Sequence, residues 1–311
     1  MRPGDIELGK KIIADLISFG NKQFMPGIKS NANFSCFVEQ IIDSIRRIKY
    51  IKIIQERENS SCCANPYLTC FDPLKAAVWY KNQGNINEAF WLVFLSVHFG
   101  KHKKSRWHLV RNIYGGLQNK NKWDWIRTSS DPFAFREWLH NNLEEIKKSG
   151  SVGNHRKYIS LNAFKDNGTG AVINSYIDWI GSTHDHQNMV KYAQSKAGSD
   201  PRAIFDFLYT YMDKVVQFGR LARFDYLTMV GKLGLARIEP GSLYLKGSSG
   251  PLLGARLLFG GSTNAKIEVK ALDSSLNELE TQLNLYFGMQ VLEDALCNWQ
   301  KSPEKYFHFS G

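Results

Sequence analysis

A glycine-rich stretch, YLKGSSGPLLGARLLFGG, at residues 244–261 is the first candidate for a ligand-binding segment. It holds five glycines and one proline in eighteen residues. Small turn residues ahead of a helix that begins near Pro251 can aim backbone N–H groups at a phosphate. The alternative is a tight helix–helix turn that binds nothing. The residues expected to bind phosphate here are Lys246, Gly247, Gly250, Gly254 and Arg256.

A carboxylate follows that stretch after room for one helix and a short loop. Asp273 lies in KALDSSLNELE, 19 residues after Gly254, and is expected to be the N-cap of the next helix. A carboxylate beside a glycosidic bond stabilises the positive charge that develops on the sugar, or it activates water. Asp273 is the first candidate for a catalytic carboxylate, a role that the family resemblance described below implies. Asp225 in FGRLARFDY is the second, and its alternative is a structural ion pair with Arg220 or Arg223.

Two basic segments and a set of aromatic and polar residues complete the candidate site. The segments are FGKHKKSRWH at 99–108 and GNHRKY at 153–158, and the alternative for both is a solvated basic face. The residues expected to contact the DNA backbone are Lys101, Lys103, Lys104, Arg106, His155, Arg156 and Lys157. The residues expected to form a base pocket are Asn154, Tyr158, Arg220, Phe224 and Tyr226. The alternative for Phe224 and Tyr226 is the apolar core, where aromatic side chains are common.

The net charge restricts the class of partner. The 311 residues contain 40 Lys and Arg against 29 Asp and Glu, which gives a net charge of +11. Such a surplus favours a polyanion, with nucleic acid as the leading candidate, over an ordinary basic protein. The longest apolar run, at 89–99, is shorter than the roughly 18 residues of a membrane span and is expected to be a buried helix. No membrane and no obligate protein partner is expected.

Cysteine and histidine usage predicts neither a metal site nor a cofactor. The five cysteines are an odd number, and the N-terminus lacks the apolar core of a signal peptide, so reduced thiols in the cytoplasm are expected. Adjacent Cys62 and Cys63 cannot easily share one tetrahedral ion, and no CxxC pair accompanies them. His184 and His186 in STHDHQ have no flanking set of ligands.

The sequence predicts helices along the whole chain, and these helices carry the candidate residues. Apolar residues recur at helical spacing in DIELGKKIIADLISFGNKQ and FVEQIIDSIRRIKYIKIIQER. Asp-Pro pairs at 131–132 and 200–201 predict two further helix starts. Few segments alternate as a strand would. The sequence therefore predicts an all-α fold without a flexible boundary.

The order of these features resembles the helix-hairpin-helix DNA glycosylases, which pair a phosphate-gripping hairpin with a catalytic aspartate. The resemblance covers roughly 88–285, with a longer stretch at 166–241 than in compact members. It implies two helical lobes around a central cleft. The implied domains are an N-terminal helical region at 1–80 that packs with the C-terminal helices, a helical core with the glycine-rich hairpin at 81–270, and C-terminal helices with Asp273 at 271–311. Leu252 and Leu253 stand where bifunctional members carry a lysine, which implies a glycosylase without lyase activity.

A closer resemblance lies with the alpha-glutamyl/putrescinyl thymine pyrophosphorylase family. The segments that carry it are GNHRKYISL, FGRLARFDYLTMVGKLGL, IEPGSLYLKGSSGPLLGARLLFGG and MQVLEDALCNWQKSP. The resemblance implies an enzyme that acts on modified phage DNA. One implied activity is that of a glycosylase that excises alpha-glucosylated hydroxymethylcytosine in anti-phage defence. The other is displacement of pyrophosphate during base hypermodification. The expected partner is double-stranded DNA with modified bases, and the remaining alternative is a DNA-binding module without activity.

Overall fold

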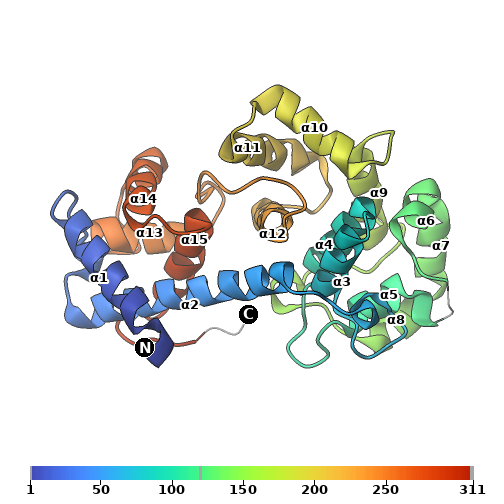
Figure 1. The fold of residues 1–311 in the computed structure, drawn as a ribbon, viewed down its shortest axis with the longest axis horizontal. Helices are drawn as coiled ribbons and strands as arrows, with labels where there is room; N and C mark the ends of the chain where they lie inside the picture. The colour runs from blue at the N-terminus through green and yellow to red at the C-terminus, as the bar shows by residue number, and fades with distance from the viewer. Residues whose placement is uncertain (1, 119–120, 309–311) are drawn as a thin grey trace. The chain divides into compact units, whose positions relative to one another are not determined.

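The computed structural model describes residues 2–118 and 121–308, and these residues form helices joined by loops without any β-strand (Figure 1). The prediction of an all-α fold is confirmed. Isolated bridges join His102 to Arg106 and Ser160 to Gly168. The α-helices of the described residues are α1 (Ile6–Gly20), α2 (Asn31–Glu56), α3 (Pro73–Asn82), α4 (Ile86–Phe99), α5 (His108–Tyr114), α6 (Trp125–Ser130), α7 (Pro132–Asn141), α8 (Leu143–Ser149), α9 (Thr169–Ile180), α10 (His186–Ala197), α11 (Pro201–Tyr211), α12 (Arg220–Lys232), α13 (Gly250–Gly260), α14 (Val269–Leu283) and α15 (Gly288–Trp299).

The chain divides into two compact units. The first joins Met1–Tyr50 to Pro240–Ser310, and the second is formed by Ile51–Glu239. The boundary after Tyr50 falls within α2. The division into segments 1–80, 81–270 and 271–311 stays a prediction.

The first unit is built around α1, α13, α14 and α15. Helix α14 buries leucines three and four residues apart, so that one face enters the core and the other meets solvent. Its buried leucines are Leu272, Leu276, Leu279 and Leu283. Helix α13 packs on α15, and Figure 1 shows the two beside α14. This unit holds the glycine-rich stretch and Asp273.

The second unit is built around α4, whose residues 89–99 are all buried, as the apolar run predicts. Helix α4 packs against α3, α10 and α12. The Phe94 ring stacks on Tyr176 with centroids 3.7 Å apart and on Phe218 at 5.2 Å. Across the described ranges, no helix has both the length and the apolar character of a membrane span. An aromatic core therefore supports the end of α4, where the candidate site begins.

Candidate functional site

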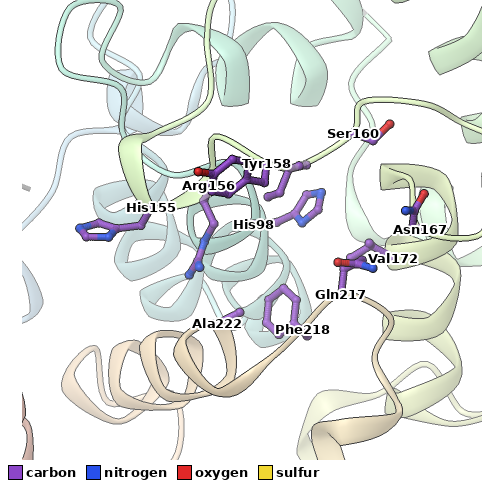
Figure 2. Close-up of a pocket in the computed structure, with 11 residues that line it drawn as sticks. His98, His155, Arg156, Tyr158, Ser160, Asn167, Val172, Gln217, Phe218 and Ala222 are labelled. Carbon is purple, nitrogen blue, oxygen red and sulfur yellow. The ribbon is translucent and has the colours of Figure 1, made fainter. Parts of the chain in front are cut away.

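A cavity of about 200 Å³ opens in the second unit, next to the C-terminal end of α4 (Figure 2). Its walls come from α4, the loop at 155–160, the start of α9, the loop before α12 and the first turn of α12. The residues that line it are His98, His155, Arg156, Tyr158, Ile159, Ser160, Asn167, Val172, Gln217, Phe218 and Ala222. Because polar side chains predominate in these walls, the cavity suits a polar ligand.

Two glycines bring the two predicted basic segments together. Helix α4 ends at Gly100, whose φ of +68° is a conformation that L side chains rarely adopt. Gly153 donates its N–H to the Phe99 carbonyl at 2.8 Å, and a Cβ on Gly153 would lie 3.0 Å from the carbonyl carbon of Gly100. The backbones of the loops at 100–107 and 150–157 therefore touch, and both loops adjoin the cavity.

The basic loop, which we define as residues 101–106, is an ordered turn. His102 and Arg106 form a backbone bridge, and the His102 ring bonds the Ser105 hydroxyl at 2.9 Å. The side chains of Lys103, Lys104 and Arg106 are exposed. Lys101 lies 5.3 Å from the centroid of the Trp107 ring, and burial lowers the pKa of Lys101. The loop thus presents cations to solvent at a fixed place beside the cavity.

Arg156 connects the cavity wall to a carboxylate. Its Nη2 lies 2.9 Å from Oδ2 of Asp225, and its Nε donates to the Val97 carbonyl at 2.7 Å. The side chain of Arg156 is 10% exposed and that of Asp225 is 37% exposed. The structure places Arg156 beside Asp225, 69 residues away along the chain, and the ion pair of Asp225 with Arg220 or Arg223 stays a prediction. Asp225 is therefore held beside the cavity by the Arg156 guanidinium.

His98 is a cavity residue that sequence reasoning missed. Its ring is buried, and its Nε2 lies 3.1 Å from the Thr169 hydroxyl oxygen. Burial, and second the charge of Arg156, lower the pKa of His98 to about 3, so the ring is neutral at physiological pH. The available signal was a histidine in the otherwise apolar run AFWLVFLSVHF.

The predicted base-pocket residues fall into separate groups. Tyr158 lines the cavity and is 89% exposed, while Asn154 is exposed but outside the lining. The assignment of Phe224 and Tyr226 to a base pocket is wrong in this structure, because they are 1% and 0% exposed and lie in the core. The carbon at the centre of the Arg220 guanidinium lies 5.1 Å from the Phe224 ring centroid.

Tyr226 belongs to a chain of hydrogen bonds inside the second unit. Its hydroxyl bonds that of Tyr176 at 2.8 Å, and Tyr176 bonds Nε2 of His186 at the same distance. The other ring nitrogen of His186 bonds Asn87 at 2.9 Å. These groups satisfy one another, so His186 serves the core. No cluster of three potential metal ligands occurs in the part of the chain that the structure describes.

Asp273 lies in the first unit and does not start a helix. Helix α14 begins at Val269 with Glu268 as its N-cap, so the expected N-cap role of Asp273 is wrong. The apolar spacing continues upstream through Val269 and Leu272, which extends the helix by one turn before Asp273. The Oδ1 atom of Asp273 is buried without a hydrogen-bond partner among the described residues, and burial raises the pKa of this carboxyl group.

The glycine-rich stretch forms a turn and then α13. Gly247 has a φ of +79°, Lys246 is exposed, and Pro251 stands in the first turn, as predicted. Gly250 and Gly254 face α15, where a Cβ on Gly254 would lie 2.8 Å from the Leu296 carbonyl carbon. Glycine is required at both positions because α13 and α15 pack closely there.

Polar groups remain unpaired at this stretch. No side chain caps the N-terminus of α13, where Ser249 is the N-cap residue. The Nε of Arg256 is buried without a hydrogen-bond partner among the described residues. The phosphate-binding assignment of this stretch stays a prediction that now depends on the turn and the helix N-terminus.

The fold and the cavity define an all-helical protein with a polar pocket beside a loop of exposed cations. Comparison with family models matches residues 32–311 to alpha-glutamyl/putrescinyl thymine pyrophosphorylase clade 3. The chain belongs to this family, which confirms the family resemblance of the sequence. Neither a curated protein nor a solved structure matches the chain significantly. The family name indicates an enzyme of DNA base modification.

Proposed function

We propose that the protein hydrolyses the N-glycosidic bond of a modified pyrimidine in double-stranded DNA. Alpha-glucosylated hydroxymethylcytosine in phage DNA is the substrate that we propose first, with a role in anti-phage defence. The observation that carries the proposal is the Arg156–Asp225 pair at the wall of a polar cavity. Through Arg156, the pair holds a carboxylate directly behind the wall of the cavity in which we propose that the base is held.

The proposed reaction follows from the chemistry of the bond. The basic loop binds phosphates and orients the duplex without reading its sequence. The target nucleotide leaves the base stack and its base enters the cavity. As the bond between the sugar and the base breaks, the base takes the bonding electrons and the sugar becomes cationic. The negative charge of a nearby carboxylate stabilises that cation until water adds to it.

Two carboxylates are candidates for this role. Asp273 is the first choice from its position in the sequence, and its raised pKa comes from burial in α14. Asp225 is supported by its bond to Arg156, which lines the cavity of the same unit. We propose the glycine-rich turn at 247–250 and the N-terminus of α13 as a further phosphate contact, as in helix-hairpin-helix glycosylases. Leu252 and Leu253 in place of a lysine support base release without strand cleavage.

A second candidate function is displacement of pyrophosphate from an activated hydroxymethyl pyrimidine in DNA. The family name and the lining favour it, because Arg156 and His155 stand in the cavity wall and none of the described lining residues is a carboxylate. A guanidinium such as that of Arg156 stabilises the charge of a departing pyrophosphate. This reaction also requires an amine nucleophile and leaves the base on the sugar.

One assay separates the two functions and the silent DNA-binding module. Duplexes with glucosylated hydroxymethylcytosine, with a pyrophosphorylated hydroxymethyl pyrimidine or with plain cytosine are incubated with the protein, with and without putrescine as the amine. Free base is measured by mass spectrometry, abasic sites by alkali cleavage, and released pyrophosphate enzymatically. Free base with strands intact before alkali supports a monofunctional glycosylase. Pyrophosphate release overturns the first proposal in favour of the second. If neither product forms, the protein is a DNA-binding module without activity.

A further inference from the structure

The buried ring of His98 presents a nitrogen that no protein group satisfies. Its Nε2 bonds Thr169, and within residues 2–118 and 121–308 no group bonds Nδ1. The ring is nine-tenths or more buried and belongs to the cavity wall (Figure 2). Nδ1 is not one of the buried side-chain atoms of the described residues that lack a partner, so it is accessible from the cavity. The cavity is the direction from which a partner can come.

The hydrogen-bond network assigns the tautomer of this ring. The Thr169 hydroxyl donates its single hydrogen to the Ser160 carbonyl at 3.0 Å. Its oxygen is therefore the acceptor in the 3.1 Å bond to His98, which places the ring hydrogen on Nε2. In a neutral ring Nδ1 is then an acceptor. The Arg156 guanidinium, which lines the same cavity, opposes a second proton on the ring.

We propose that Nδ1 of His98 accepts a hydrogen bond from an N–H group on the pairing edge of a pyrimidine in the cavity. The donor is the ring N3–H of a 2,4-dioxopyrimidine or the exocyclic amino group of a 4-aminopyrimidine. His98 thereby determines which bases the cavity holds, and Thr169 positions it by fixing the tautomer. The inference rests on the proposed function in that a base enters this cavity.

Other residues that line the cavity can donate hydrogen bonds to the carbonyl groups on the pairing edge of a pyrimidine. The side-chain amides of Asn167 and Gln217 form no hydrogen bond to any described residue, so both are available to a ligand. Gln217 has a φ of +57°, a strained conformation that is most often found at functional sites. A base that offers acceptors alone, such as an N3-methylated thymine, would leave Nδ1 unsatisfied and is expected to be rejected.

The first experiment needs neither DNA nor activity. The two-bond ¹H–¹⁵N spectrum of labelled protein reports the tautomer of each histidine, and His98→Phe identifies the His98 signals. We expect the Nε2–H form for His98 in the wild type and a mixture of tautomers in Thr169→Val. An Nδ1–H form in the wild type would overturn the proposal.

The second experiment measures binding of three probes, thymidine 5′-monophosphate, deoxycytidine 5′-monophosphate and the N3-methyl derivative of the first. We expect one of the unmethylated nucleotides to shift the His98 Nδ1 signal and to bind about tenfold more tightly than the methylated one, the value of one hydrogen bond with its unsatisfied partner. The nucleotide that succeeds shows which donor is read. His98→Phe should bind all three alike, while His140→Phe, an exposed control outside the cavity, should behave as wild type.

Three outcomes contradict the proposal: equal binding of methylated and unmethylated nucleotides by the wild type, discrimination retained in His98→Phe, or no binding of any probe. These results do not depend on which bond the enzyme breaks. A protein that discriminates among the nucleotides but releases neither base nor pyrophosphate from DNA would retain this inference and lose the proposed reaction.

Discussion

A side chain at Gly254 should destabilise the protein because α13 and α15 touch at this residue. In Gly254→Ala the new Cβ would lie 2.8 Å from both the carbonyl carbon and the Cβ of Leu296. Carbon atoms in favourable contact are about 3.5–4.0 Å apart, so the two helices must separate. Overpacking costs about 1–3 kcal/mol, and alanine returns roughly 1 kcal/mol through its better helix propensity. The carbonyl group of Leu296 is part of the helix backbone and cannot move aside as a flexible side chain could. The overpacking cost therefore lies in the upper part of its range, and we expect a net loss of about 2 kcal/mol in the free energy of unfolding.

The matched control is Gly20→Ala, also in a helix of the first unit. A Cβ on Gly20 would meet the end of the Met25 side chain at 3.8 Å, an ordinary contact, so this variant should be neutral or slightly stabilised. Urea unfolding followed by circular dichroism measures both, and a loss of about 2 kcal/mol corresponds to a melting temperature lower by about 4–8 °C. Unchanged stability in Gly254→Ala together with weaker DNA binding would refute the packing argument and restore a phosphate role to this glycine.

Three further predictions concern activity, binding and pH. If Asp225 is the carboxylate of the reaction, Asp225→Asn abolishes base release at unchanged DNA affinity while Asp273→Asn retains it; the reverse result in the abasic-site assay would restore Asp273. Replacing Lys103 and Lys104 by alanine should flatten the slope of log affinity against log salt by about 2, measured by fluorescence anisotropy, and an unchanged slope would remove the basic loop from the interface. Burial raises the pKa of Glu88 to about 7, so stability should fall by about 3 kcal/mol as the pH rises from the unfolded value of 4.5 to about 7. Glu88→Gln should remove this fall in urea unfolding, and a fall of the same size in the variant would show that another group causes it.

Local patterns in the sequence were sufficient to predict that the elements are helices. The Asp-Pro pairs predict α7 and α11, and the side chains of Asp131 and Asp200 indeed cap these helices by accepting hydrogen bonds from backbone N–H groups. Capping and apolar spacing act within a few residues, so a single sequence shows them. The expected N-cap role of Asp273 is wrong for a reason that is also local. The apolar spacing at Val269 and Leu272 continues the helix upstream, so α14 begins one turn before Asp273.

The candidate site was less predictable because it depends on contacts between distant segments. The bond between Arg156 and Asp225 joins residues 69 positions apart, and no spacing rule relates them. Phe224 and Tyr226 have the composition of a base pocket, yet the rotation of α12 turns them into the core. Conversely, His98 reads as one polar residue in an apolar helix, and its place in a cavity wall follows from the tertiary structure.

The touching backbones of Gly100 and Gly153 make the basic loop and the loop that carries Arg156 neighbours without an intervening side chain. An anion that shifts the basic loop is therefore expected to shift the loop that carries Arg156 as well. Linkage then requires reciprocity, since a base that fills the cavity raises the affinity of the basic loop for phosphate by the same factor that phosphate raises the affinity of the cavity for the base. If duplex DNA binds the basic loop and a modified base fills the cavity, as we propose, ordinary duplex DNA would act through this contact as an effector of its own modified nucleotide.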